Sequence, residues 1–291
     1  MFPMPMALIL SSHVAASMVG GGVSQRVLNS AKIDTMLVPT VLYGRHPGWG
    51  EPGGGPVEQD QFEGVLSGIA EQGLLDITDA VLTGYFASVG QVFDTAAVID
   101  VVRKGRRINN GVKAFSPEPV IVVDPIMGDA PGGLYVPAPI AAAIKDQLIS
   151  RADLVTPNLF ELGHITGRPL TDLASMARAA RALGRPVLVS SLPRQGRIGV
   201  LYVDDNQAWM VTHDRLPKAP NGTGDALTSA FISHMLAGDD AKAALEGAVA
   251  ATVSLVMRAN EWAAPELPLV AAADVLAKPL LALEAEAVEL A

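Results

Sequence analysis

Short apolar runs recur along the chain at spacings that suit a buried sheet. They show almost no alternation with polar residues, and they are ALILSS (7–12), MLVPTV (36–41), AVLTG (80–84), PVIVVD (119–124), DLVTP (153–157) and PVLVSS (186–191). Continuous runs of this kind are typical of strands that are covered on both faces. Helical periodicity fills stretches between them, at 57–73, 88–104, 137–147 and 171–183. The alternation predicts a doubly wound α/β fold with a mostly parallel central sheet flanked by helices.

The C-terminal part follows a different pattern. Two strand-like segments, RIGVLYVDD (197–205) and QAWMVTHD (207–214), flank a polar turn and predict an antiparallel hairpin at a sheet edge. Two or three helices are expected to finish the chain, over about 223–237, 240–259 and 268–286. Because neither a repeat nor a long linker divides the sequence, we expect one domain over 1–291. The glycine-rich stretch HPGWGEPGGGP (46–56) is interpreted as a mobile loop of the site.

Composition narrows the class of protein. Of the 291 residues 49% are hydrophobic and 18% are charged, which is ample material for a large core. The formal net charge of −9 argues against a nucleic-acid partner, since phosphate backbones require clustered Lys and Arg. The one basic run, RKGRRINNGVK (103–113), is interpreted as a solvated helix end and loop. The sequence has no cysteine, which excludes disulfides, a thiolate nucleophile and Cys-ligated metal.

The N-terminal stretch superficially resembles a signal peptide. It has no Lys or Arg before its apolar run, and ALIL is too short for a normal hydrophobic region, so a first strand is the better interpretation. No apolar stretch approaches the ~20 residues that a spanning helix needs. We therefore expect a cytoplasmic protein with no membrane partner.

Ligands of open α/β sheets bind beyond the carboxyl ends of the strands, so the polar residues that follow each apolar run belong together. These positions are Ser12–His13, Tyr43 to His46, Gly84–Tyr85, Asp124 to Asp129, Thr156 to Glu161, Ser190–Ser191 and Gly222 to Asp225.

The stretch KAPNGTGDALTSAFISHML (218–236) places two glycines and an acid before an amphipathic segment. Gly222 and Gly224 allow close approach of a ligand, and the N–H groups at a helix start favour an anion. On spacing alone, Asp225 is either an N-capping residue or a catalytic acid at the rim of an anion cradle. A helix dipole should lower the pKa of Asp225.

Two further motifs carry acids at strand ends. In VVDPIMGD (122–129), Asp124 and Asp129 either hold a hydrated divalent cation or belong to an Asp-Pro turn and a cap. In DLVTPNLFELGHITG (153–167), Asn158 and Glu161 either contact phosphate oxygens and metal-bound water, or they form a helix cap with a first-turn acid.

Together the motifs identify a family. SSHVAASMVGG, TGYFAS, DPIMGD, GGLYVP, TPNLFEL and NGTGDALTSAF occur in the order seen in pyridoxal kinases of the ribokinase superfamily, and the resemblance covers about residues 7 to 260. GTGD marks the superfamily, whereas SHV together with TGY points to the vitamin B6 branch. The resemblance implies a ribokinase-like fold and ATP-dependent phosphorylation of the 5′-hydroxymethyl group of pyridoxal, pyridoxine or pyridoxamine. It further implies Mg²⁺, a monovalent cation (K⁺ or Na⁺) and a homodimer.

The resemblance also implies residue roles. Asp225 would accept the hydroxyl proton, and Gly222, Thr223 and Gly224 would form the anion hole for the transferring phosphoryl group. The substrate side would comprise Ser12 at the pyridine ring, Tyr85 beside it and His46 in the substrate loop. The nucleotide and magnesium side would comprise Asp124, Asp129, Tyr135, Asn158, Glu161, Ser190 and Ser191, with Asp124, Asp129 and Glu161 nearest the metal. A weak base suffices, because the hydroxyl proton leaves late in a loose transition state.

The sequence departs from the family pattern around the substrate. Gly21 stands where the family has Asn, and Arg45-His46-Pro47 replaces an Asn-His-Thr loop, so Pro47 offers no hydroxyl. Trp49 either stacks on a pyridine ring or covers the core. The alternatives are a hydroxymethylpyrimidine kinase of the same superfamily and a non-catalytic vitamer-binding protein. The remaining histidines, His164, His213 and His234, are interpreted as helix or surface residues.

Overall fold

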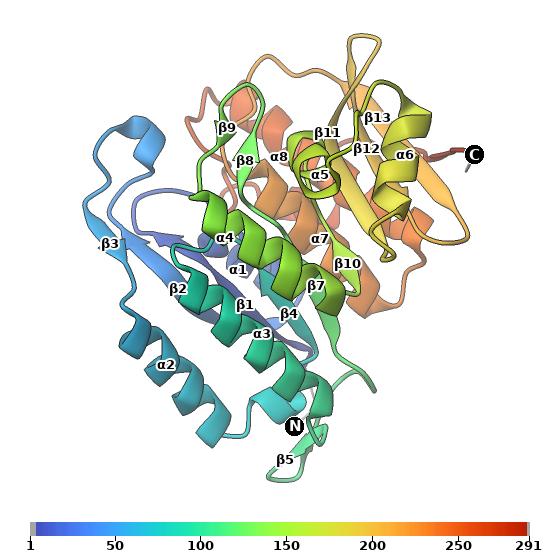
Figure 1. Ribbon diagram of the computed structural model, residues 1–291. Helices are drawn as coiled ribbons and strands as arrows, with labels where there is room; N and C mark the ends of the chain where they lie inside the picture. Colours follow the sequence, from blue (N-terminus) through green and yellow to red (C-terminus); the bar gives the residue numbers. More distant parts are fainter. Residues whose placement is uncertain (1–3, 290–291) are drawn as a thin grey trace.

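The apolar runs become neighbouring strands of one ten-stranded sheet in the computed structural model, which describes residues 4–289 (Figure 1). The strand order is β14-β13-β12-β11-β10-β7-β4-β1-β2-β3. The parallel strands are β1 (Met6–Val14), β2 (Asp34–Tyr43), β4 (Ala80–Thr83), β7 (Val120–Val123), β10 (Leu154–Val155) and β11 (Val187–Arg194). From β1 the chain proceeds to β2 on one side and later to β4 on the other, so the strand order reverses beside β1. Such a switch point opens a crevice at the carboxyl edge of the sheet.

Antiparallel strands complete both edges. The predicted hairpin is confirmed as β12 (Arg197–Val203) and β13 (Ala208–Asp214), and β14 (Glu286–Ala287) pairs outside it. At the other edge, β3 (Gly54–Pro56) pairs with β2, so the predicted glycine-rich loop contains a short strand. A Cβ on Gly54 would lie 2.0 Å from the carbonyl oxygen of Leu42. Glycine at this position therefore lets the edge strand pack closely.

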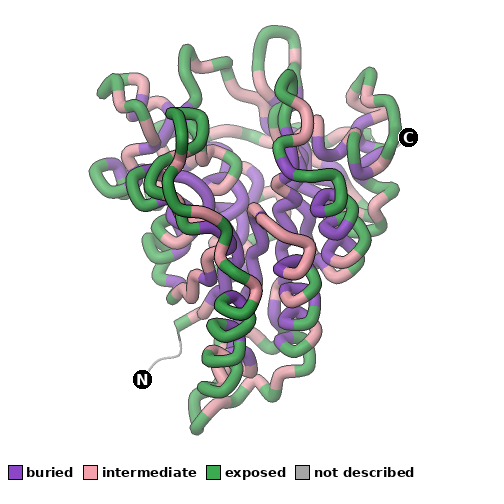
Figure 2. Tube along the Cα trace, turned by 60° about the vertical axis from the view of Figure 1, so that its left-hand side comes forward, coloured by how far each residue is buried: buried purple, intermediate pink, exposed green. Residues whose placement is uncertain are grey.

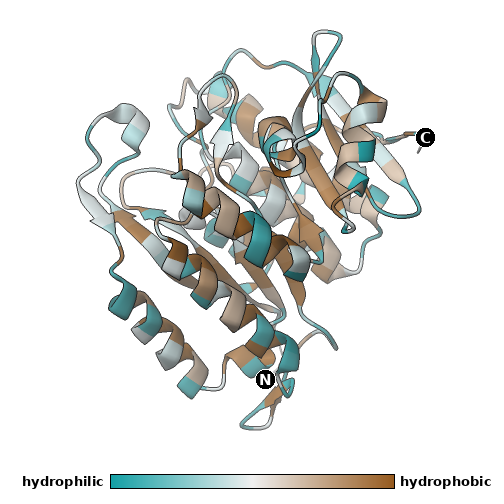
Figure 3. Cartoon of the chain, in the orientation of Figure 1, coloured by the Kyte–Doolittle hydropathy of each residue, from teal (hydrophilic) through white to brown (hydrophobic). Residues whose placement is uncertain are grey.

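Two helical layers cover the sheet because successive side chains of the central strands point to opposite faces. In β1, Ala7 and Ile9 pack into the core under α1, α7 and α8, whereas Leu8 and Leu10 pack into the core under α2, α3 and α4. The first layer comprises α1 (Gly21–Ser30), α7 (Thr223–Ala237) and α8 (Ala241–Glu261). The second comprises α2 (Gln59–Glu71), α3 (Val89–Lys104) and α4 (Ala138–Ala143), and α5 (Leu159–Thr166) and α6 (Leu173–Arg181) flank the region around β11. Figure 2 shows the buried interior between exposed outer surfaces, and Figure 3 shows the apolar strands at the centre.

Short elements connect these layers. They are the 3-10 turns η1 (Pro47–Trp49), η2 (Leu75–Ile77) and η4 (Ile149–Arg151), the π-helical η3 (Ile144–Leu148) that continues α4, the helix α9 (Asp274–Ala277), and the small ladders β5 (Ile108–Asn109) with β6 (Val112–Lys113) and β8 (Gly128–Asp129) with β9 (Gly133–Leu134). Within residues 4–289 we find no helix with the length and apolar character needed to cross a membrane.

The predicted helix over 268–286 is wrong. Only α9 is helical there, and Lys278 adopts φ −135° and ψ 80° before Pro279. Proline disfavours the helical conformation of the preceding residue and cannot donate the next helical bond. The segment beyond it runs along α8 instead, with the Leu280 N–H donating to Ser254 Oγ (2.8 Å) and the Ala285 N–H to Glu246 Oε1 (2.8 Å).

The interpretation of the basic run needs one correction. It does hold the end of α3 and a short connecting ladder, but Arg107 is not solvated. Its side chain is 18% exposed and pairs at 2.7 Å with Asp79, whose side chain is 1% exposed. Buried ions require such a partner, so this arginine is part of the fold.

Candidate active site

A cleft of about 1850 Å³ lies at the carboxyl ends of the parallel strands. The structure brings together along it every residue to which the sequence assigned a site role. These are Ser12, His46, Tyr85, Asp124, Asp129, Tyr135, Asn158, Glu161, Ser190, Ser191, Gly222, Thr223, Gly224 and Asp225. Their individual roles stay predictions.

Asp225 is not the cap of its helix. Gly222 is the N-cap residue of α7, with a left-handed φ of 88°, and no side chain caps this end. The Asp225 carboxylate instead accepts a hydrogen bond from the Gly20 N–H at 2.9 Å. The N-cap alternative for Asp225 is therefore wrong.

Burial governs the protonation of Asp225. Desolvation raises the pKa of its carboxyl group to about 6, although the backbone N–H groups of Gly20 and of Asp225 itself act in the opposite direction. The expectation that the helix dipole would lower this pKa is thus wrong, because desolvation outweighs the effect of the dipole. At neutral pH the carboxylate is mostly ionised and basic enough to accept a proton.

The glycine pair forms a cradle around the start of α7. Thr223 and Gly224 are its first residues, so their N–H groups precede the helical ladder and are free to meet an anion. A Cβ on Gly222 would lie 2.6 Å from the Met18 carbonyl oxygen, whereas one on Gly224 would meet open space. The first glycine therefore packs the helix against the chain after β1, and the second leaves room for a ligand.

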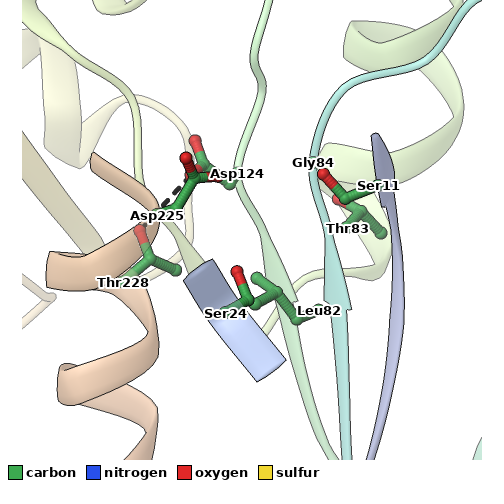
Figure 4. A pocket seen from close by; sticks show the side chains of 8 residues that line it. All are labelled: Ser11, Ser24, Leu82, Thr83, Gly84, Asp124, Asp225 and Thr228. Atoms are coloured by element: carbon green, nitrogen blue, oxygen red, sulfur yellow. Dashed lines mark hydrogen bonds between the residues drawn. The ribbon is translucent and has the colours of Figure 1, made fainter. Parts of the chain in front are cut away.

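Asp124 lies beside Asp225 at the end of β7. Figure 4 shows both carboxylates above a small recess lined by Ser11, Ser24, Leu82, Thr83, Gly84 and Thr228. The Thr228 hydroxyl lies 3.4 Å from Asp124 Oδ2 and 3.1 Å from Thr156 Oγ1. Burial, followed by the charges of Glu161 and Asp225, raises the pKa of Asp124 well above its ordinary value. This concentration of negative charge would be relieved by a cation.

Glu161 joins α5 to the loop after β7. One oxygen accepts the Met127 N–H at 3.0 Å and the Gly128 N–H at 3.4 Å, and the other accepts the Asn158 N–H at 2.8 Å. Desolvation raises the pKa of Glu161 to about 7, against the effect of these three N–H groups. The capping alternative for Asn158 and Glu161 is thus correct as local structure, while both residues also line the cleft.

The acids fit a hydrated metal better than a closed protein cage. Residues 4–289 contain no group of three His, Cys, Asp or Glu side chains arranged to hold a metal ion. Both oxygens of Glu161 already accept backbone hydrogen bonds, so it would act through water. Mg²⁺ keeps several waters and takes one or two carboxylates together with phosphate oxygens, which is compatible with this arrangement.

The opposite part of the cleft lies at the switch point. Ser12 comes from β1, and Tyr85 follows β4, where its N–H donates to Ser11 Oγ (3.3 Å). The His46 ring nitrogen Nδ1 accepts the Gly48 N–H (3.1 Å) and lies 3.5 Å from Asn221 Nδ2, next to the glycine cradle. Pro47 lines the cleft, whereas Trp49 is 48% exposed and neither lines it nor covers the core.

Serines and an exposed tyrosine form the side near β11. The Ser190 N–H donates to the Pro157 carbonyl at 3.1 Å, and Ser191 has a φ of 64° where the β11–β12 register shifts. Tyr135 is 52% exposed beside β9.

Several residues of the cleft escaped the sequence analysis. They include Gly20, Arg168, Arg215 and an apolar group formed by Val200, Leu227, Val249, Val253 and Val256. The apolar residues carry no polar signal, and Gly20 gains its role only through Asp225.

Of the remaining histidines, His164 is exposed on α5 and His234 on α7 lies 2.6 Å from Asp239. His213 lies half-buried on β13, where desolvation lowers its pKa, and it lines the cleft together with His164.

Comparisons with known proteins agree with this arrangement. A family model for phosphomethylpyrimidine kinase matches residues 92–265. The pyridoxal kinase of Leifsonia xyli subsp. xyli is 35% identical over 280 residues, which cover 94% of this chain and 95% of that one. The chain belongs to the pyridoxal kinase family. A second member, the pyridoxine/pyridoxal/pyridoxamine kinase of Bordetella avium, is 34% identical over 86% of this chain and 82% of its own.

The family fold is confirmed by a solved structure. The pyridoxal kinase of Leishmania donovani in complex with ADP and ginkgotoxin superposes with a TM-score of 0.88 over 98% of this chain and 99% of that one. The identity is 23%, so this likeness concerns the fold alone. The predicted ribokinase-like architecture, with a mostly parallel sheet and an antiparallel edge hairpin, is correct.

Proposed function

We propose that this protein transfers the γ-phosphoryl group of ATP to the 5′-hydroxymethyl group of pyridoxal or a closely related vitamer, yielding the 5′-phosphate for vitamin B6 salvage. The observation that carries the proposal is the position of Asp225, a part-buried carboxylate beside the glycine cradle at the start of α7. Family membership and the names of the relatives from Leifsonia and Bordetella support the substrate class.

The proposed chemistry is an in-line displacement. The substrate hydroxyl gives its proton to Asp225 while its oxygen forms a bond to the γ-phosphorus, and the bond from that phosphorus to the bridging oxygen of ADP breaks. N–H groups of Gly222, Thr223 and Gly224 stabilise the charge on the transferring group. A carboxylate with a pKa of about 6 is strong enough, since positioning and charge stabilisation supply most of the rate.

The remaining cleft residues divide between the two substrates. Ser12, Tyr85 and His46 are proposed to hold the vitamer, because they surround the end of the cleft at the sheet switch point. Tyr135, Asn158, Ser190 and Ser191 are proposed to contact the nucleotide on the other side, with Asp124, Thr223 and Gly224 at its phosphates.

Asp124 and Asp129 are proposed to hold Mg²⁺ directly or through water, and Glu161 through water. Burial, with the charges of neighbouring acids adding to it, raises the pKa of Asp124 and Glu161, and a cation at this point would stabilise their ionised forms. When bound, Mg²⁺ would neutralise charge on the phosphate oxygens. A K⁺ or Na⁺ requirement, a homodimer and a cytoplasmic location also belong to the proposal through family membership, and light scattering after gel filtration tests the dimer.

A coupled ADP-release assay over pyridoxal, pyridoxine, pyridoxamine and hydroxymethylpyrimidine tests the function. We expect turnover with the B6 vitamers that requires both ATP and Mg²⁺. Asp225→Asn should lower kcat by about 10²–10⁴-fold while leaving the fold intact, the range for loss of a general base. A folded Asp225→Asn variant with a near wild-type rate would rule out this mechanism.

The panel also separates the alternatives. The match of 92–265 to the phosphomethylpyrimidine kinase model makes a hydroxymethylpyrimidine kinase the second candidate. Preferential turnover of the pyrimidine would establish it. Tight pyridoxal binding without turnover, with any nucleotide or metal, would instead identify a binding protein.

A further inference from the structure

A hydrogen bond between Gly20 and Asp225 connects two segments of the cleft that are far apart in the sequence. The Gly20 N–H donates to Asp225 Oδ2 at 2.9 Å across 205 positions of sequence. Gly20 is also the N-cap residue of α1, and its carbonyl accepts the N–H groups of Val23 and Ser24. The start of α1 is therefore joined directly to the first turn of α7.

We propose that Gly20 is a positioning residue for phosphoryl transfer, which aims the Asp225 carboxylate at the substrate hydroxyl and keeps Ser12 beside it. This inference rests on the proposed function, in which Asp225 accepts the proton and Ser12 binds the ring.

The backbone at this position requires glycine. Gly20 has φ 58° and ψ −139°, a conformation that side-chain-bearing residues rarely adopt. A Cβ here would lie 2.1 Å from Ser12 Oγ and 3.0 Å from the Ser12 carbonyl oxygen. Any side chain would displace either Ser12 or the N–H that donates to Asp225. The absence of a Cβ at this position therefore preserves both the place of Ser12 and the hydrogen bond to Asp225.

Neighbouring contacts hold this N–H in place. The Met18 N–H donates to Glu266 Oε2 at 2.9 Å, and the Met18 carbonyl packs against Gly222, where a Cβ would come within 2.6 Å. The segment from Met18 to Gly20 is thus fastened to Glu266 on one side and to α7 on the other. A carboxylate that accepts from a fixed backbone donor is restrained in orientation, which is what a base in a near-attack geometry needs.

Gly20→Ala tests the inference, with Gly22→Ala as the matched control. The two glycines are two positions apart, but a Cβ on Gly22 would meet only the Arg26 guanidinium at 3.5 Å, an ordinary contact. We expect Gly20→Ala to lower kcat by about 10- to 100-fold, the range for a lost hydrogen bond to a charged group, with the KM for ATP within about twofold. Gly22→Ala should stay within about twofold of the wild type.

The acid side of the pH profile separates positioning from a purely structural effect. Without its N–H donor the ionised form of Asp225 is less stabilised, so the acid limb of kcat/KM should move to higher pH in Gly20→Ala. A ¹³C titration of the Asp225 carboxyl group, assigned by its loss in Asp225→Asn, should show the same upward shift without any turnover. Gly22→Ala should leave both unchanged.

A second variant serves if Gly20→Ala does not fold. Glu266→Ala removes the acceptor of the Met18 N–H and leaves Asp225 intact, so a smaller fall in kcat, about threefold, with the same direction of pH shift is expected. An unchanged acid limb and carboxyl titration in a folded variant would overturn the role of Gly20. Absence of phosphoryl transfer by the wild type would overturn the proposed function instead, while the carboxyl titration would still decide the hydrogen bond.

Discussion

Asn158 and Glu161 cap the start of α5 reciprocally. The Glu161 N–H donates to Asn158 Oδ1 at 2.9 Å, and the Asn158 N–H donates to Glu161 Oε2 at 2.8 Å. Because the other oxygen of Glu161 holds the N–H groups of Met127 and Gly128, the same carboxylate joins a helix start to the loop that carries Asp129. Local structure and cleft chemistry thus depend on one side chain.

Replacement of Glu161 should therefore affect both stability and metal dependence. In Glu161→Gln an amide NH₂ takes the place of one accepting oxygen, and we expect the free energy of unfolding to fall by about 1–3 kcal/mol. The Mg²⁺ concentration for half-maximal activity should rise several-fold. Asp172→Ala is the control, because Asp172 forms the corresponding capping box of α6 outside the cleft. It should lower stability without changing the Mg²⁺ response; equal Mg²⁺ responses of the two variants would contradict the assignment.

The activity should follow the ionisation of Asp225. With a pKa of about 6, the basic form falls about tenfold for each pH unit well below that value. We expect kcat/KM to rise from pH 5 and level off above pH 7 at saturating Mg²⁺ and ATP. The residual activity of Asp225→Asn should not show this fall in kcat/KM at acid pH. A wild-type rate that increases as the pH falls from 7 to 5 would be inconsistent with a carboxylate base.

The stability of the unliganded protein should depend on pH in the opposite direction from its activity: the contribution of these acids to the free energy of unfolding should fall as the pH rises. Raised pKa values mean that folded Glu161 and Asp225 bind protons more tightly than the unfolded chain does. Their contribution to stability is thus present at low pH and is lost as the pH rises from about 4 to about 7. A shift of Glu161 from 4.5 to about 7 corresponds to about 3 kcal/mol. Urea unfolding at pH 5.5 and 8 should show the destabilisation by Glu161→Gln shrinking at pH 8; a larger loss at pH 8 would refute the sign.

Arg215 should contribute to nucleotide binding. Within the described part of the chain, Arg168 and Arg215 are the two Arg or Lys residues that line the cleft, and the Arg215 side chain forms no ion pair there. We expect Arg215→Ala to raise the KM for ATP about tenfold with little change in the KM for pyridoxal, as for a charge-assisted contact with phosphate. Arg194→Ala is the control outside the cleft. Equal effects of the two variants on the KM for ATP would argue against this contact.

Substrate preference should depend on Pro47 rather than on Trp49, since only the former lines the cleft. Pro47→Thr supplies a hydroxyl beside the substrate and should change the ratio of kcat/KM among pyridoxal, pyridoxine and pyridoxamine by several-fold, the effect of one hydrogen bond. Trp49→Ala should leave this ratio within about twofold. A Trp49 effect larger than that of Pro47 would place the tryptophan at the ring after all.

The strand runs and most of the helices could be predicted from the sequence because they depend on neighbours within one element. Unbroken apolar runs such as Ala80–Thr83 are buried in a parallel sheet whatever lies further along the chain. The strand ends likewise brought Asp124, Glu161 and Asp225 to one edge, since parallel strands end there together. The helix predicted over 268–286 was wrong because the apolar periodicity there was given more weight than Pro279, which stops a helix locally.

The sequence by itself determined the α/β class, the strand-end position of the acids and the motif order of the family, all of which follow from local pattern. Only the tertiary structure decided what Asp225 does, since its partner Gly20 lies 205 positions away and its pKa depends on burial by the surrounding elements. The helix dipole is visible in the sequence, but the desolvation that outweighs it arises only when the elements pack together.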